Sequence, residues 1–318
     1  MPDEGIIFAS KRDGTHKYYI MNDDGSNVQL INTSGLPANA KIEQAPQWSI
    51  ESGKYFLTAS VNGIYDIYSM GAGGGGVVNL TNTPGLTEEA IALSPDGKLI
   101  AYIATEAQQD IFVMKVDGSE AKNLTKFSTI YANLVWAPDS SRIYFNTIRA
   151  GTPNIFSIKP DGSELTNISR GPGVDGGFSL SPDGKQIAFD SDRAGYNDIF
   201  IISSDGGEAT NLTNSPEVRD TLPLWAPDGK HIAFFSDKEG GRDIFVLNLD
   251  DKSIVNLTKN PDIVEANLAW MPDGRLLFVA TIDNQQDIFV IALDGSPAIN
   301  LTNNPAIDYG PTYLKFKK

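Results

Sequence analysis

Short apolar runs separated by tight turns recur along the chain. Residues 90–93 form one such run, and a Ser-Pro-Asp-Gly turn follows at 94–97, where proline presets φ and glycine accepts a left-handed backbone. The next run, 99–104, is β-branched and aromatic without polar alternation, which is typical of a strand covered on both faces. A third apolar run at 111–114 and a shorter, more polar segment at 122–125 complete the unit. The pattern predicts four antiparallel strands.

This four-strand unit repeats through the whole sequence. Its clearest marker is an Asp-Ile-aromatic triplet in the third strand, with Asn replacing Asp once, and successive triplets lie 44 or 45 residues apart. A period of this length is typical of propellers and repeat arrays, and four antiparallel strands per repeat favour a propeller blade. The triplets begin at Asp66, Asp110, Asn154, Asp198, Asp243 and Asp287.

The two ends of the chain predict how the ring closes. Residues 17–21 supply a seventh third strand, and the chain starts inside a blade, at a second strand over 6–10. It ends with an unpartnered first strand over 311–316. We therefore expect an all-β, seven-bladed propeller forming one domain over 1–318. The C-terminal strand would join the N-terminal three, so that residues of about 1–32 and 309–318 share the closing blade and no sheet edge is left open.

The repeat, written W-(S/A)-P-D-G-K-x-I-A-F, D-I-F, D-G-(S/G) and N-L-T, resembles the blade of TolB-like propellers, which are relatives of the WD-repeat blade. The resemblance covers essentially the whole chain. It implies a protein-binding propeller that is periplasmic or exported if a leader has been removed, and cytoplasmic otherwise. The family's type member has six blades and an extra N-terminal domain and binds an envelope lipoprotein. Seven predicted blades depart from that pattern, so its partner is not carried over.

The net charge of the chain indicates which kinds of partner it can bind. Forty acidic residues against 25 basic ones give a net charge of -15, which repels nucleic acid and anionic membranes and favours a basic protein or peptide. No run approaches the roughly 20 apolar residues of a membrane span, so we expect no membrane insertion. The absence of cysteine excludes disulfides, thiolate zinc sites and cysteine nucleophiles. We expect the protein to act as a monomer.

A regular acidic position lies five residues before each tryptophan or its equivalent, at the start of the predicted innermost strand. Six of the seven residues are carboxylates, and together they are expected to ring one mouth of the central channel. They could accept backbone N–H bonds or pair with a basic loop residue of the adjoining blade. Alternatively, they could hold a cation, most plausibly Ca²⁺, or a basic peptide. The positions are Glu43, Glu88, Tyr131, Asp175, Asp220, Glu265 and Asp308.

Two further groups fall on the same predicted face, which is formed by the connections from second to third and from fourth to first strands. Basic residues recur after the second strand and suit the pairing account. Aromatic and basic residues that break the repeat are candidate interface anchors. The first group is Arg12, Arg149, Arg193 and Lys238, and the second is Phe127, Tyr131, Tyr196, Arg219 and Tyr309. The repeated triplet aspartates are expected to be structural, bonding turn N–H groups.

The sequence gives little support for a catalytic function. Only His16 and His231 are present, so no histidine-rich metal centre can form, and no G-x-S-x-G elbow occurs. We predict a non-enzymatic binding or scaffold propeller without a cofactor, presenting a rigid loop face and an acidic channel mouth to a protein or peptide. Alternatives are a small polar ligand, sugar or Ca²⁺ in the channel mouth, carboxylate-based lyase or hydrolase chemistry, or an excised or engineered array without a partner.

Overall fold

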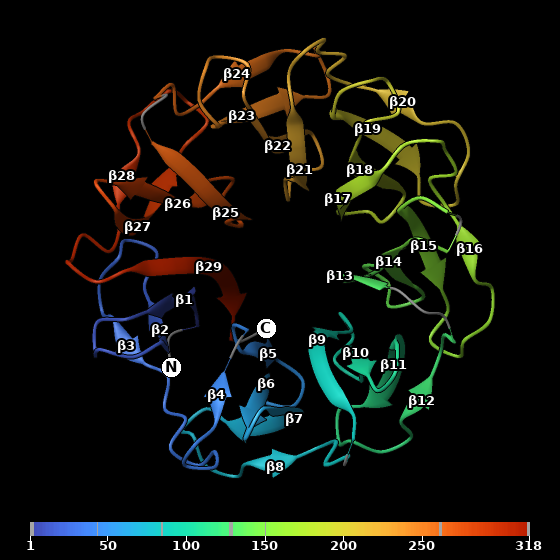
Figure 1. The fold of residues 1–318 in the computed structure, drawn as a ribbon. Coiled ribbons are helices and arrows are strands. Elements are labelled where there is room, and N and C mark those ends of the chain that lie inside the picture. Colours follow the sequence, from blue (N-terminus) through green and yellow to red (C-terminus); the bar gives the residue numbers. More distant parts are fainter. Residues whose placement is uncertain are drawn as a thin grey trace.

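A computed structural model describes residues 3–42, 44–83, 85–126, 130–149, 151–260 and 263–316, with the side chains of 130–132 excepted. Seven antiparallel sheets are arranged in a ring around a central axis (Figure 1). Within these ranges no helical segment is long and apolar enough to cross a membrane. The predicted all-β, seven-bladed propeller is confirmed.

Each blade contributes four strand positions from the channel outwards. The innermost strands are β4 (Lys41–Ile42) with β5 (Gln47–Ser49), β9 (Thr87–Leu93), β13 (Ile130–Trp136), β17 (Asp175–Leu180), β21 (Asp220–Trp225), β25 (Val264–Trp270) and β29 (Asp308–Lys315). The second strands are β6 (Lys54–Val61), β10 (Leu99–Thr105), β14 (Ile143–Thr147), β18 (Gln186–Ser191), β22 (His231–Ser236), β26 (Leu276–Ile282) and β1 (Glu4–Ser10).

Six of the seven third strands carry the Asp-Ile-aromatic triplet, the strand over 17–21 being the exception, and the outer strands, which have one neighbour each in the sheet, are short. The third strands are β7 (Ile64–Gly71), β11 (Gln109–Lys115), β15 (Asn154–Ile158), β19 (Asp198–Ser203), β23 (Asp243–Asn248), β27 (Gln285–Ile291) and β2 (Lys17–Met21). The outer strands are β8 (Val78–Asn79), β12 (Lys122–Asn123), β16 (Thr166–Asn167), β20 (Thr210–Asn211), β24 (Ile254–Asn256), β28 (Ile299–Asn300) and β3 (Gln29–Leu30). We number the blades 1 to 7 in this order.

Blade 7 closes the ring. Its sheet has the order β29-β1-β2-β3, so the last strand of the chain lies beside the first (Figure 1). The pairing runs from Glu4 opposite Lys315 to Ser10 opposite Asp308, with one irregularity after Ile7. The predicted closure by the C-terminal strand is therefore confirmed.

The core lies between blades, which explains why the second and third strands show no polar alternation. Residues on one face of a sheet pack on the preceding blade, and those on the other face pack on the next. Tryptophans near the end of innermost strands bond the preceding blade: Trp136 Nε1 donates to Ala92 O at 2.9 Å, and Trp270 Nε1 to Leu224 O at 3.0 Å. Trp136 and Trp270 therefore link neighbouring blades.

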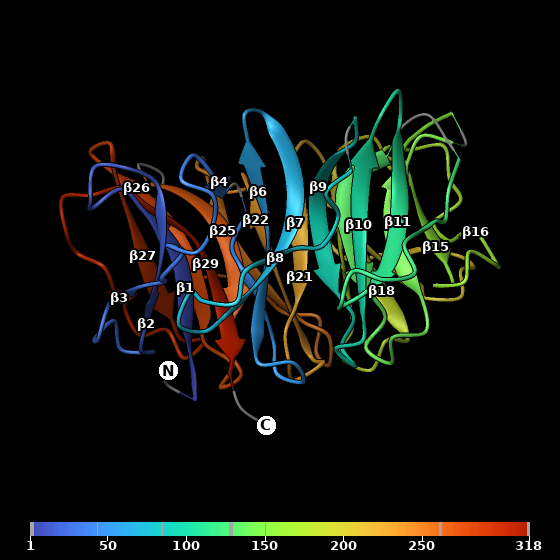
Figure 2. The same cartoon turned by 90° about the horizontal axis from the view of Figure 1, so that it is seen from below.

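The antiparallel order places the loops on two opposite faces. First-to-second and third-to-fourth connections, which include the Ser-Pro-Asp-Gly and Asp-Gly turns, lie on one face. The second-to-third and fourth-to-first connections lie on the other, which we call the loop face. Figure 2 shows the ring from its side, with the hairpin between β6 and β7 at the loop face and the end of β29 at the opposite face.

Candidate functional site

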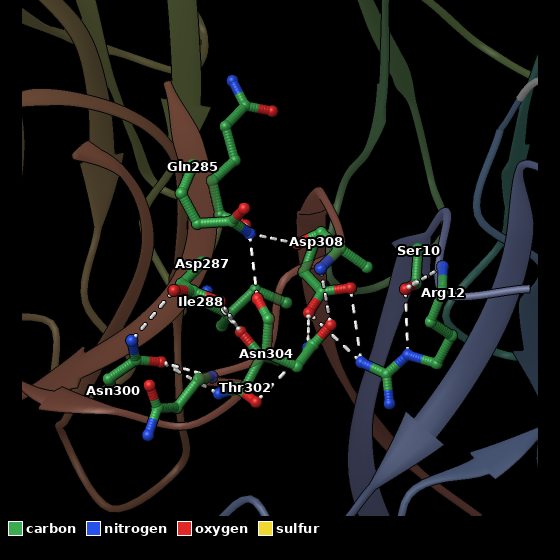
Figure 3. Close-up of polar contacts among 12 residues, drawn as sticks. Ser10, Arg12, Gln285, Asp287, Ile288, Asn300, Thr302, Asn304 and Asp308 are labelled. Carbon is green, nitrogen blue, oxygen red and sulfur yellow. Dashed lines mark hydrogen bonds and ion pairs between the residues drawn. The ribbon is translucent and has the colours of Figure 1, made fainter. Parts of the chain in front are cut away.

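The triplet aspartates join the third strand to the outer strand. In blade 2, Asp110 accepts hydrogen bonds from Asn123 Nδ2 and Thr125 Oγ1, both at 3.0 Å, and Thr125 Oγ1 accepts the N–H of Ile111 at 2.9 Å. The triplet and the Asn-Leu-Thr sequence are therefore two halves of one network. Figure 3 shows the same arrangement in blade 6, where Asp287 meets Asn300 and Thr302. These carboxylates link the two strands, and in blades 2 and 6 they bond side chains of the Asn-Leu-Thr sequence, whereas the sequence had suggested turn N–H groups.

The predicted acidic positions lie inside the wall of the channel mouth. Each of the five described carboxylates begins an innermost strand or lies next to its first residue, and each is at most 2% exposed. They therefore do not form an exposed acidic surface. The five are Glu88, Asp175, Asp220, Glu265 and Asp308. Glu43 and Phe127 lie outside the described residues, and for Tyr131 only the backbone, paired with Asn146, is described.

Two of these carboxylates bind an arginine. Arg12 Nη2 lies 3.1 Å from Asp308 Oδ2, and Arg193 Nη2 lies 2.8 Å from Asp175 Oδ1. Both arginines come from the same blade as their aspartate, whereas the sequence had favoured the adjoining blade. The residue facing each aspartate across the strand pair is a serine, Ser10 or Ser191, whose hydroxyl accepts the arginine Nε–H. The blade 7 pair is drawn in Figure 3.

Each of these guanidinium groups also covers an aromatic pair. The Arg12 carbon Cζ lies 5.1 and 4.8 Å from the ring centroids of Phe8 and Tyr19. The Arg193 carbon Cζ lies 4.9 and 5.3 Å from those of Phe189 and Phe200. Ion pairing, the hydroxyl and the ring faces together compensate the charge of a buried carboxylate.

At the other three carboxylates, the length of the acid compensates the size of the residue that faces it on the second strand. Glu88 faces Ala104 and Glu265 faces Ala280, whereas Asp220 faces Ser236. A longer acid thus stands where the opposite residue is shorter, which keeps the local volume similar.

Burial raises the pKa of all three of these acids. For Glu88, the Thr83 hydroxyl, which donates to one carboxylate oxygen, opposes the rise. For Asp220, the Ser236 hydroxyl opposes it. For Glu265, burial and then the charge of Asp243 raise the pKa to about 7. Each acid faces the triplet aspartate of the preceding blade, so two carboxyl groups meet at these junctions.

The remaining predicted residues are dispersed over the loop face. Tyr196 is 47% exposed at the hairpin of blade 4. Arg149 is exposed in blade 3. Tyr309 is half-buried, and its ring centroid lies 5.5 Å from that of His16. Lys238 occupies the position of Arg12 and Arg193 in blade 5, where its backbone N–H bonds Ser236 Oγ at 3.3 Å. The structure does not gather these side chains into one cluster.

One buried acid was not identified from the sequence. Asp190 in β18 accepts the N–H groups of Gly177 and Leu222, both at 2.9 Å, and so links blade 4 to blade 5. Leu222 has φ of 55° and is 48% exposed. A side chain at Gly176 would collide with Asp190, since its Cβ would lie 2.2 Å from Oδ1. The Gly176-Gly177 pair, which interrupts the repeat, was the available signal.

Two cavities lie between neighbouring blades. A cavity of about 590 Å³ lies between blades 7 and 1, beside His16 and Lys41. Another, of about 290 Å³, is lined by Glu265 and the aromatic pair of blade 6. No group of three or more His, Cys, Asp or Glu side chains suited to a metal ion occurs among the described residues.

Residues 166–277 match the TolB beta propeller domain family. No curated protein sequence matches the chain. Among solved structures, TolB from Acinetobacter baumannii is 17% identical, with a TM-score of 0.58, and the alignment covers 94% of this chain and 78% of that protein. Puromycin hydrolase is 16% identical, with a TM-score of 0.75, and the alignment covers 96% of this chain and 52% of the hydrolase.

Oligogalacturonate lyase in complex with manganese is 14% identical, with a TM-score of 0.69, and the alignment covers 92% of this chain and 83% of the lyase. At these identities the likeness shows a shared fold. Residues 166–277 therefore match the TolB beta propeller domain family, and the chain as a whole has the seven-bladed propeller fold.

Proposed function

We propose that the chain is a non-catalytic binding propeller whose loop face receives a protein or peptide partner. The supporting observation is the number of exposed apolar side chains that lie on this face. Of 13 large hydrophobic residues exposed in the described ranges, seven lie on the loop face, and the other six lie on the opposite face or the outer strands. The loop-face residues are Ile64, Ile148, Val174, Tyr196, Leu222, Val264 and Ile282.

Such residues favour a protein partner over a small ion. Apolar groups that stay exposed on a rigid frame lose little conformational freedom on binding, and aromatic anchors are frequent in interfaces. The surrounding net charge of -15 favours a partner with a basic surface. Because the acidic ring itself is buried, this attraction comes from the overall charge, and we expect it to weaken as salt is raised.

A photo-crosslinking experiment tests this function. A photoreactive residue is placed at Tyr196 or at Val264 on the loop face, and at Ile50 on the opposite face as the matched control. We expect the same partner to be captured from both loop-face positions and not from Ile50. Unlabelled protein should compete, whereas the variant Val174→Ser/Tyr196→Ala/Leu222→Ser should not. Equal capture from Ile50 would contradict the proposal, and no specific partner from either face would favour an array without one.

A second candidate function is binding or cleavage of a sugar, which the overall likeness to oligogalacturonate lyase favours. Incubation with oligogalacturonate, with and without Mn²⁺, and detection of an unsaturated product would reveal lyase activity. A Ca²⁺ titration followed by melting temperature belongs to the same series, because a cation that binds only the folded protein must raise that temperature. Product formation would replace the non-catalytic proposal.

A further inference from the structure

Blades 4 and 7 show what can occupy the space beside a buried carboxylate of this ring. In both, an arginine two residues after the facing serine lies over the aromatic pair and bonds the aspartate. The rings beneath it stack at centroid distances of 5.8 Å for Phe8 and Tyr19 and 5.7 Å for Phe189 and Phe200. Two blades of the same chain therefore provide an internal template for a guanidinium site.

Blade 6 has this arrangement without its arginine. Phe278 and Phe289 stack at 5.6 Å, and Glu265 stands at the acidic position. The facing residue is Ala280 instead of serine, and the residue two positions later is Ile282 instead of arginine. The acid and the rings are thus retained while the chain's own cation is absent.

A cavity of about 290 Å³ lies at this place. Glu265, Phe278, Phe289 and Ile282 all line it. Both carboxylate oxygens of Glu265 are buried without a hydrogen-bond partner, and the nearby Thr258 hydroxyl donates to Asp243 at 3.4 Å. A buried carboxyl group without donors is costly, and it becomes favourable when a ligand supplies them. Ile282 is 41% exposed, so the cavity reaches the surface where the arginine would enter.

The packing of the Asp-Gly turns supports the same location. At three other blade junctions, a Cβ built on the turn glycine would lie 2.4 to 3.3 Å from the backbone oxygen of the residue that follows the preceding outer strand, as at Gly25, Gly118 and Gly206, and at Gly162 the nearest atom would lie at 3.7 Å. At Gly295, in the corresponding turn of blade 6, no atom lies within 4 Å. The interface between blades 5 and 6 is therefore more open beside the cavity.

We propose that this cavity binds a guanidinium group from another molecule, which takes the place that Arg12 and Arg193 fill in their own blades. The planar cation would donate two N–H bonds to Glu265 and stack on Phe278 and Phe289. The volume, at the lower end of the range for small-ligand sites, suits an arginine side chain or a small guanidinium compound. The inference does not depend on what the loop face binds.

Arg242 of blade 5 is the nearest alternative donor. Its Cζ lies 4.0 Å from the centroid of Phe235, and it forms no ion pair with Glu265 in this structure. Blade 2 combines Glu88 with Ala104 in the same way, but one oxygen of Glu88 already accepts a bond from Thr83. The site in blade 6 is therefore the better candidate.

Calorimetric titration with arginine amide tests the proposal, and citrulline amide is the matched ligand because it replaces the cation with a neutral group of similar shape. We expect citrulline amide to bind at least about tenfold more weakly. Glu265→Gln should weaken arginine amide binding by a similar factor. Ile282→Arg should abolish it and raise the melting temperature, since the new side chain would fill the cavity as in blades 4 and 7.

Two neighbouring variants are the controls. Asp283→Asn removes a nearby exposed charge and should leave the affinity unchanged, and Arg242→Gln should leave it unchanged or raise it. Circular dichroism and melting curves verify that each variant is folded. Equal binding of the two amides, no binding of arginine amide by the wild type, or unchanged binding by Ile282→Arg would each overturn the proposal. Comparing agmatine with a short arginine-containing peptide would distinguish a free small molecule from a protein side chain.

Discussion

At the buried acidic positions of this ring, the type of acid matches the residue on the opposite strand. An aspartate at the start of an innermost strand faces serine, and a glutamate faces alanine, as at Asp175 and Glu265. Where an arginine follows the serine in blades 4 and 7, the charge is compensated. Where it does not, burial raises the pKa of the acid.

Glu265 should therefore make stability depend on pH. Its pKa in the folded protein is about 7, against an ordinary value of 4.5, because of burial and Asp243, and the charge of Arg242 opposes the rise. Between these values the folded protein holds the proton more tightly, so the free energy of unfolding falls as pH rises, by up to about 1.4 kcal/mol per pH unit. Glu265→Gln should flatten this fall.

Melting curves at about pH 5 and about pH 8 measure the effect. The variant should gain stability relative to the wild type at the higher pH, and Asp283→Asn serves as the control for a lost charge outside the site. If the difference between Glu265→Gln and wild type were the same at both pH values, the buried carboxyl would not titrate in this range.

The positions of the acidic and basic residues along the strands could be predicted from the sequence. The spacing located Glu88, Asp175 and Glu265 at strand starts, and it located the basic position at Arg193. Their burial and the pairing within one blade could not be predicted, because both depend on cross-strand register, which spacing along one strand does not give. The register places Ser191 opposite Asp175, and this contact decides where the arginine lies.

At the scale of strands and turns, neighbouring blades meet through repeated small contacts. The Asp-Gly turn of one blade packs on the outer strand of the preceding blade, and the Asp-Asn-Thr network holds that outer strand to its own sheet. The sequence showed both markers at a common period, but only the structure shows that Asp110, Asn123 and Thr125 share hydrogen bonds.

Two matched glycine substitutions test the turn contact. Gly25 and Gly295 occupy the same turn position with φ of 82° and 85°. A Cβ at Gly25 would lie 2.4 Å from Leu301 O, whereas one at Gly295 would meet no atom within 4 Å. Gly295→Ala should cost about 1–2 kcal/mol through the backbone alone, and Gly25→Ala should cost about 1–3 kcal/mol more through the clash. Urea unfolding of both variants checks this, and equal costs would show that the turns do not bear on the neighbouring blade.

For the whole molecule, the ring depends on the pairing of β29 with β1. The missing Ser-Pro-Asp-Gly turn after the last strand and the seventh third-strand copy at 17–21 allowed this closure to be predicted. The open interface between blades 5 and 6 could not be predicted from the sequence. Ile282 is an ordinary apolar residue there, and only the structure shows that it occupies the position of Arg12 and Arg193 in their blades.

A disulfide across the closure should stabilise the ring strongly. Glu4 and Lys315 are paired, and their Cα separation in such a ladder, about 4.5–5.5 Å, suits a disulfide. Because the chain has no cysteine, Glu4→Cys/Lys315→Cys can form only this bond within one molecule. We expect up to about 5 kcal/mol from the constrained unfolded chain. The melting temperature should rise without reductant and return to the wild-type value with it, and no rise would mean that this pair does not limit unfolding.

The same pairing sets how the ring would respond to force. Glu4 and Lys315 lie opposite each other at one end of the antiparallel ladder between β1 and β29. Tension applied to these two residues would load the hydrogen bonds one pair at a time, from Glu4 and Lys315 towards Ser10 and Asp308, instead of shearing them all together. A propeller that resists heat through closure would then open at low pulling force, with the Arg12–Asp308 pair among the last contacts to part.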